Sequence, residues 1–195
     1  MGIAWPKEFV ETLDFLAKNI AKNMLVSEAE AECNWPMTVC VGDLQPLNIL
    51  RRTDGTDKLV FIDFQLSMLS EGHGTDIGYF LMWVLSPSER RKHEKRIIHK
   101  HYDAMIAAGM DGSIYPFSLY FLRYKVLTQF SFVKLALALA GINRTEDRYI
   151  AAVIYESLSA FIKDHGSMYD NWVESVRQRK ALMLKLNKDG GRTII

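Results

Sequence analysis

Cysteine, a surplus of charge of one sign and long uninterrupted apolar stretches are all scarce in this chain. The net charge is +1, from 24 basic and 23 acidic residues, so no strong electrostatic field predicts a nucleic acid or an anionic membrane as partner. The two cysteines, Cys33 and Cys40, are too few for a disulfide scaffold of the secreted type. We therefore expect reduced thiols in a cytosolic protein.

The distribution of apolar residues also argues against a membrane protein. The most apolar stretch, residues 126–142, carries Lys134 at its middle, and its uninterrupted part is shorter than the ~18 residues that a membrane span needs. It predicts a buried core helix. At the N-terminus no basic region precedes an apolar run, and Pro6 stands where a myristoylation signal needs Ser or Thr. The expected location is cytoplasmic, with no membrane partner.

A hydrophobic content of 49% in 195 residues is enough for one substantial core, so we expect one domain over residues 1–187 and a flexible tail over 188–195. Short β-prone runs occur at 38–41, 49–50 and 59–62, with Asp54-Gly55 as a turn. The remainder predicts helices, the second capped by Thr75 and the third by Ser86, so the fold class is α+β, mostly α. The expected helices cover about 6–30, a segment starting at 76, 87–109, 116–141, 145–166 and 171–186.

The spacing of Asp43, Asn48 and Asp63 fits the template of phosphoryl transfer. In that template one Asp accepts a hydroxyl proton, an Asn five residues later holds a metal, and an Asp at the end of the next strand holds the metal bound to ATP. Asp63 follows four apolar residues, and a carboxylate near a core needs a metal or hydrogen-bond donors. The plainer alternatives are that Asp43 only forms a turn and that Asn48 only satisfies loop backbone groups.

Two segments carry a family resemblance. GDLQPLNIL (residues 42–50) and IDF (62–64) resemble the HGDxxxxNIL and ID[FW] motifs of the aminoglycoside and choline phosphotransferase superfamily. IDFQLS followed by TDIGYFL (75–81) is similar to the ecdysteroid kinase-like (CHK kinase-like) branch. The resemblance implies the C-terminal lobe of a protein kinase-like fold, in which a small β hairpin carries the catalytic and metal-binding loops.

The activity that the resemblance implies is transfer of the γ-phosphoryl group of ATP to an alcohol group of a small molecule. Asp43 would be the catalytic base, and Asn48 and Asp63 would hold Mg²⁺. Four weaker candidates for substrate binding or loop support come from the same resemblance or from their position in the sequence. They are Gln45, Gln65, His73 and Asp76. Gln45 and His73 are equally well explained as loop residues, and Asp76 as a carboxylate stabilised by a helix dipole.

Two departures from the family pattern are visible. Val41 replaces the family's His, which braces the catalytic loop, and only about one helix precedes the motif, so we expect the nucleotide-covering lobe to be absent. Weak binding of Mg-ATP and self-association through an exposed apolar cleft surface should follow. Three hypotheses stay open: a phosphotransferase, alone or completed by a lobe encoded elsewhere; a degenerate pseudokinase that binds without turnover; and a truncated product without function.

A basic segment over residues 90–101 contains three histidines. A nucleic-acid or metal site is one interpretation, but acidic residues are interspersed and the basic positions point in different directions on a helix. We predict a solvated helix face, with the apolar residues Ile97, Ile98, Tyr102 and Met105 facing the core.

Overall fold

The computed structural model describes residues 35–71, 73–140 and 147–188, together with Lys7 and Glu11. Lys7 and Glu11 are helical and form an i,i+4 ion pair of 3.5 Å. Most of the helix predicted over residues 6–30, and the tail from residue 189 onward, lie outside the described residues.

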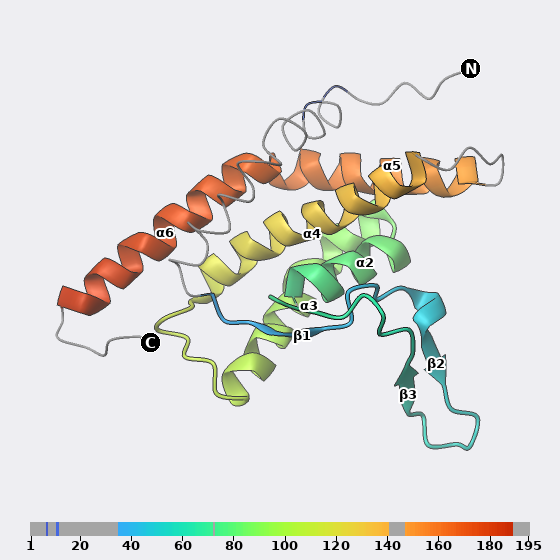
Figure 1. The fold of residues 1–195 in the computed structure, drawn as a ribbon, viewed down its shortest axis with the longest axis horizontal. Coiled ribbons are helices and arrows are strands. Elements are labelled where there is room, and N and C mark those ends of the chain that lie inside the picture. Colours follow the sequence, from blue (N-terminus) through green and yellow to red (C-terminus); the bar gives the residue numbers. More distant parts are fainter. Residues whose placement is uncertain (1–6, 8–10, 12–34, 72, 141–146, 189–195) are drawn as a thin grey trace.

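Within residues 35–188, apart from the undescribed gaps, five α-helices form the body of the structure (Figure 1). They are α2 (Tyr79–Val84), α3 (Pro87–Ala107), α4 (Phe117–Ala140), α5 (Asp147–His165) and α6 (Met168–Lys188). The apolar helix α4 runs through the middle and contacts the other four. The expected mostly helical α+β class is confirmed.

Four short strands occur among the described residues and lie along one side of the helices (Figure 1). The strand β1 (Thr38–Cys40) pairs antiparallel with β4 (Met68–Ser70), which places Val39 opposite Leu69. The strands β2 (Ile49–Arg51) and β3 (Leu59–Phe61) form a hairpin that projects away from the helices, with Leu50 opposite Val60. The runs predicted around the loop and after the turn are confirmed, whereas β4 was not predicted.

Helix starts were predicted with mixed success. Ser86 caps α3 as expected, because its Oγ accepts a hydrogen bond of 3.3 Å from the N–H of Glu89. The cap predicted at Thr75 is wrong, because this residue lies inside a π-helix (His73–Gly78) and its hydroxyl pairs with Ser70 at 2.9 Å. The last helix begins at Met168 rather than 171, since the hydroxyl of Ser167 caps it.

The π-helix packs tightly on α4. A Cβ atom added at Gly78 would lie 1.9 Å from the Oγ1 of Thr128, and one at Gly74 would lie 2.4 Å from the Cβ of Leu127. Only glycine permits this close approach. The π-helix is therefore fixed against the central helix, and this position determines where Asp76 and α2 lie.

The core between α4 and the surrounding helices is rich in aromatic rings. Its most deeply buried rings come from α4, α5 and the segment before α4, and edge-to-face pairs join rings within the core. The most deeply buried aromatic residues are Tyr115, Tyr120, Tyr124, Phe132 and Phe161.

A buried ionic network joins α3, α4 and α5. Arg90, only 1% exposed, donates to Glu94 at 2.7 Å and to Asp164. Glu94 also accepts hydrogen bonds from Tyr124 (3.1 Å) and from His165, and its pKa is lowered by His165 and Arg90 against the opposing effect of burial. The prediction of a fully solvated helix face is wrong at Arg90 and Glu94, because α5 and α4 supply partners for both charges. The prediction that Ile98 faces the core is confirmed.

His73 is a core residue and not a loop residue. It is 2% exposed and stacks on Tyr120, with ring centroids 3.7 Å apart. Burial, followed by the nearby His101 and Arg123, holds the pKa of His73 well below its ordinary value of 6.5. The imidazole of His73 is thus neutral in the folded protein. The prediction of a loop residue, drawn from its position between two glycines, is wrong.

Cys40 is a free, fully buried thiol on β1, and burial followed by the Asp76 carboxylate raises its pKa to about 12. Cys33 lies outside the described residues. In residues 35–71, 73–140 and 147–188, each helix is too short or too polar to cross a bilayer.

Two neighbouring arginines, Arg90 and Arg91, share Asp164 as partner. The ionic network predicts that replacing each of them by alanine will lower the free energy of unfolding by very different amounts. Arg90→Ala should lower the free energy of unfolding by about 3 kcal/mol, because Glu94 keeps its buried charge and loses a cation. Arg91→Ala, whose side chain is 47% exposed, should cost less than about 1 kcal/mol. Urea denaturation of both variants measures this. Equal losses would contradict the predicted difference between the buried Arg90 and the exposed Arg91.

The burial of His73 predicts that the folded protein loses stability in acid. Its folded-state pKa is depressed, so the unfolded chain binds the extra proton, and stability present above pH 6.5 is lost as the pH falls below that value. The loss should approach about 1.4 kcal/mol per pH unit. His73→Phe keeps a ring against Tyr120 and should flatten this slope in urea denaturations between pH 7.5 and 5.5. The same replacement at the exposed His99 should leave the slope unchanged; equal slopes in both variants would contradict the prediction.

Candidate functional site

A tight loop after β1 brings Asp43 and Asn48 together. The Gln45 N–H donates to the Asp43 carbonyl and the Asn48 N–H to the Gln45 carbonyl, both at 2.9 Å. Pro46 then opens one turn of 3₁₀ helix (Pro46–Asn48). As a result the buried Asn48 amide donates to the Asp43 carbonyl oxygen at 2.9 Å and to its Oδ2 at 3.2 Å.

The Asp43 carboxylate is oriented by three side chains. Besides Asn48, the amide of Gln45 donates to Oδ2 at 2.8 Å and the hydroxyl of Tyr79 donates to Oδ1 at 3.1 Å. Burial, together with the charge of Asp43, raises the pKa of Tyr79 to about 12, so the phenol stays protonated and acts as a donor at neutral pH. Gln45 therefore lies beside Asp43 and contacts its carboxylate.

Sequence reasoning missed Tyr79 as a site residue. The signal was present, since Tyr79 follows Asp76 by three positions in TDIGYFL, and residues three apart share a face of a helix. What the sequence did not show is that this face meets the Asp43 loop.

Asp76 holds the backbone of the same loop. Its carboxylate accepts the N–H of Val41 at 2.8 Å and the N–H of Gly42 at 2.9 Å. Hydrogen bonds to an ionised acceptor are about twice as strong as neutral ones. The segment around α2 therefore fixes the loop twice, through Asp76 at the backbone and through Tyr79 at the Asp43 carboxylate.

Gly42 ties the loop to the segment that follows Asp63. Its φ is +86°, and a Cβ atom there would lie 2.0 Å from the carbonyl oxygen of Leu66. Both the backbone conformation and the missing side chain are required. The two motif segments are therefore in direct backbone contact.

Asp63 follows β3 and lies next to the Asn48 end of the loop, because the N–H of Ile62 donates to the carbonyl of Asn48 at 3.0 Å. Its φ of +62° is uncommon for a residue with a side chain and occurs at functional sites more often than elsewhere. The expectation of a carboxylate near the core is wrong, because the projecting hairpin leaves Asp63 exposed. Among the described residues, its carboxylate has no hydrogen-bond or ion-pair partner.

Among the described residues, two of the weaker candidates form no hydrogen bond with Asp43 or Asn48. Gln65 is exposed on the turn after Asp63, and His73 is in the core beside Tyr120. The structure therefore brings together Asp43, Asn48, Gln45, Asp76 and Tyr79, with Asp63 at the edge.

The donor set of the site suits a hard cation. Asp43 and Asp63 offer carboxylate oxygens, and the Asn48 amide, whose nitrogen faces Asp43, leaves its oxygen for another partner. The described residues contain no group of three or more His, Cys, Asp or Glu side chains placed to hold a metal ion. Mg²⁺ fits such a sparse set, because it is commonly held by one or two carboxylates, waters and the phosphates of a ligand.

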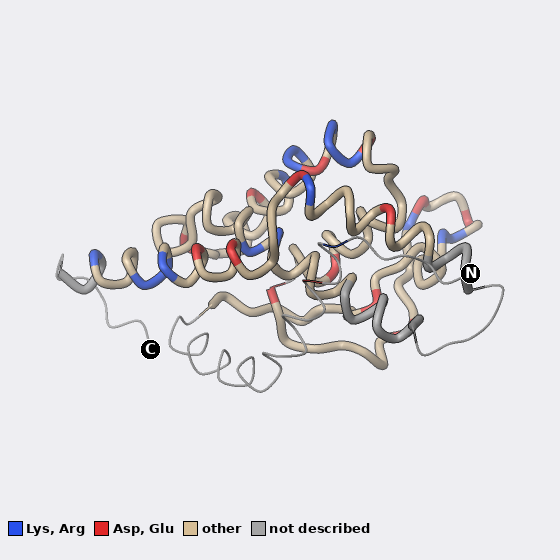
Figure 2. The backbone as a smooth tube through the Cα atoms, turned by 90° about the horizontal axis from the view of Figure 1, so that it is seen from above, with Lys and Arg blue, Asp and Glu red and all other residues tan. Residues whose placement is uncertain are grey.

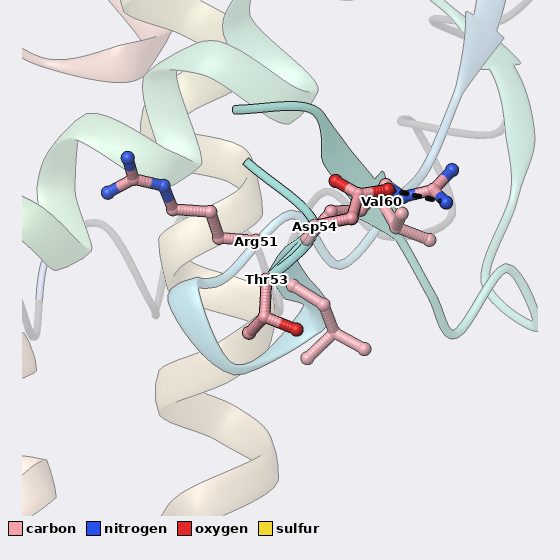
Figure 3. Close-up of a pocket in the computed structure, with 6 residues that line it drawn as sticks. Arg51, Thr53, Asp54 and Val60 are labelled. Atoms are coloured by element: carbon pink, nitrogen blue, oxygen red, sulfur yellow. Dashed lines mark ion pairs between the residues drawn. The ribbon is translucent and has the colours of Figure 1, made fainter. Parts of the chain in front are cut away.

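A shallow pocket of about 340 Å³ lies on the hairpin, lined by Leu50, Arg51, Arg52, Thr53, Asp54 and Val60 (Figure 3). Arg51 points away from Asp54, which pairs with Arg52 at 2.7 Å. Asp43, Asn48 and Asp63 do not line this pocket, so it is separate from the candidate site.

Comparison with known proteins adds one match. A profile of the family described as "DUF1679: Uncharacterized oxidoreductase dhs-27" matches residues 6–164, most of the chain. No curated protein and no solved structure matched. The family description points to oxidoreduction, so the expectation that the chain is a small-molecule kinase is corrected by this finding.

The double attachment at Asp76 predicts a local effect. Asp76→Ala should speed amide hydrogen exchange at Val41 and Gly42 by roughly 10- to 100-fold, because both N–H groups lose a charged acceptor worth about 1.5–3 kcal/mol. Asp63→Ala is the control and should leave both amides unchanged. Exchange that is unaltered in Asp76→Ala would mean that the loop is held by other contacts.

Proposed function

The chain belongs to the family described as DUF1679, Uncharacterized oxidoreductase dhs-27, and we propose that it is a binding module for Mg²⁺ and a phosphate-bearing small molecule such as ATP, without turnover of its own. The observation that carries the proposal is the joining of Asp43, Asn48 and Asp63 through two backbone-linked segments. These residues supply oxygen ligands on one side and leave the rest of a coordination sphere open.

Each residue has a separate task in this proposal. Asn48 and the exposed Asp63 would hold the cation, and Asp43, oriented by Tyr79 and Gln45, would add a carboxylate or fix a bound water. When bound, Mg²⁺ would neutralise charge on the ligand's phosphates. Asp76 would keep the loop in place.

A phosphate-bearing ligand is supported by two considerations. Mg²⁺ gives up its waters reluctantly and usually reaches a protein together with phosphates rather than in an all-protein cage. The loop also resembles the metal-binding loops of the phosphotransferase superfamily, a resemblance that stays a prediction. Lack of turnover is supported by Val41, which stands where the motif of the phosphotransferase superfamily has a His. It is also supported by the donors already bound to both oxygens of Asp43.

The description of the family favours a second candidate function, oxidoreduction. In that case the phosphate-bearing ligand would be a redox dinucleotide, and the Tyr79–Asp43 hydrogen bond would be a proton donor–acceptor pair beside it. NADPH therefore belongs among the ligands tested.

The cytosol is the compartment we propose. Support comes from Cys40, which is a free thiol, because cytosolic proteins keep their cysteines reduced.

Binding of Mn²⁺ to the full chain, with and without ATP, tests the proposal by electron paramagnetic resonance and calorimetry. We expect Mn²⁺-ATP to bind with a dissociation constant on the order of 1 mM, weakened at least about tenfold in Asp63→Asn. Asp57→Asn is a matched control, because Asp57 is the other aspartate with positive φ, is exposed on the hairpin and pairs with Arg51.

Equal loss of affinity in Asp63→Asn and Asp57→Asn, or none in either, would contradict the metal site. Binding of NADPH that also depends on Asp63, followed by fluorescence, would favour the second candidate.

A further inference from the structure

Two histidines from different helices contact the same buried tyrosine of α4. His73 is the first residue of the π-helix and stacks on the ring of Tyr120. His101 comes from α3, is half-buried, and its Nδ1 atom pairs with the Tyr120 hydroxyl. Tyr120 itself is buried. The two imidazoles therefore meet at one ring inside the structure, and neither of them belongs to the candidate site.

The surroundings of His73 suit a neutral ring only. Among the described residues, its Nε2 atom is buried and has no hydrogen-bond partner. A neutral imidazole can leave one ring nitrogen as an unused acceptor, whereas a protonated imidazole has two N–H donors that both need partners. Protonation in place would therefore leave a buried donor unsatisfied, which is costly.

The carboxylates near the two histidines are already engaged. Arg123 donates to Glu71 at 2.6 and 2.8 Å, and the hydroxyl of Tyr115 donates to the same carboxylate. The Asp76 carboxylate accepts two backbone amides of the motif loop. The titratable and charged groups that face the pair are Glu71 before the π-helix, Asp76 within it, Tyr102 of α3, Tyr115 before α4, and Tyr120 and Arg123 of α4. A proton on His73 would thus be added beside the Arg123 cation.

The π-helix connects His73 to the motif loop. Asp76 follows His73 by three residues and holds the N–H groups of Val41 and Gly42. Because the glycines of the π-helix pack directly on α4, this short element cannot shift at one end and stay in place at the other. If His73 leaves its place, Asp76 moves with it, and the loop that carries Asp43 loses two backbone attachments.

Acid favours this movement. Burial holds the pKa of both histidines below the ordinary value of 6.5, so the open form of the segment binds protons that the closed form does not. The closed form is therefore fully favoured above pH 6.5 and is lost below it, by up to about tenfold per pH unit for each histidine. Basic and acidic positions are both spread over the helices (Figure 2), and the net charge is +1, so general charge repulsion contributes little.

We propose that the π-helix is an acid-sensitive switch: protonation of His73 and His101 releases Asp76, and with it the loop of Asp43 and Asn48, while α4 and α5 stay folded. The proposal does not rest on the proposed binding function, because the loop is followed through its own amides without metal or nucleotide.

Amide hydrogen exchange of the full chain, followed by NMR at pH 7.5, 6.5 and 5.5, tests the proposal. Each rate is compared with that of an unstructured peptide at the same pH, which gives a protection factor. Val41 and Gly42 should be at least about tenfold less protected than Leu158 and Phe161, which are buried in α5. The protection of the two loop amides should fall roughly tenfold between pH 6.5 and 5.5.

His73→Phe keeps a ring against Tyr120 and should reduce this fall to less than about threefold. The same replacement at the exposed His99 is the matched control and should keep the full fall. His101→Gln keeps a polar group beside Tyr120, gives an independent second variant, and should also reduce the fall. Circular dichroism confirms that each variant is folded.

Two results would overturn the proposal. Equal protection of the loop amides and the α5 amides at every pH would show that the loop opens only when the whole protein unfolds. A fall that is absent from the parent chain, or that persists in both His73→Phe and His101→Gln, would show that the two histidines do not control the loop.

Discussion

The carboxylate of Asp76 is the constraint on which the arrangement of the motif loop depends. By accepting the amides of Val41 and Gly42, it connects the strand layer to the π-helix that packs on α4. The glycine contacts of that π-helix set the position of Asp76, and Tyr79 extends the same attachment to the side chain of Asp43. The geometry of Asp43 and Asn48 is thus determined from the helical core outward.

Local signals in the sequence predicted the parts of the fold that depend on local chemistry. The Ser86 cap, the turn at Asp54-Gly55 and the helical periodicity each need only neighbouring residues, and α3 and the hairpin appear where these signals placed them. The π-helix and the burial of His73 depend on α4, about fifty residues away, and no local pattern contains that information. Arg90 shows the same limit, because its buried partner Asp164 is supplied by α5.

The candidate site divides in the same way. The offset from Asp43 to Asn48 is a property of one loop, and the structure closes it with hydrogen bonds between these two residues. The role of Tyr79 depends on the tertiary contact between α2 and the loop that carries Asp43. The burial of Asp63 depends on whether other parts of the structure cover the hairpin. The hairpin is exposed, which explains why the prediction of a carboxylate near the core was wrong. The family description, in turn, shows that loop chemistry alone did not identify the activity.

The projecting hairpin also affects the life of the protein in the cell. Exposed apolar strands are the segments that chaperones retain and that proteases remove when they stay uncovered. The exposed strands of this protein are therefore open to chaperone capture and to degradation. Its steady-state abundance should consequently depend on the apolar surface of these strands as well as on the stability of the helical core.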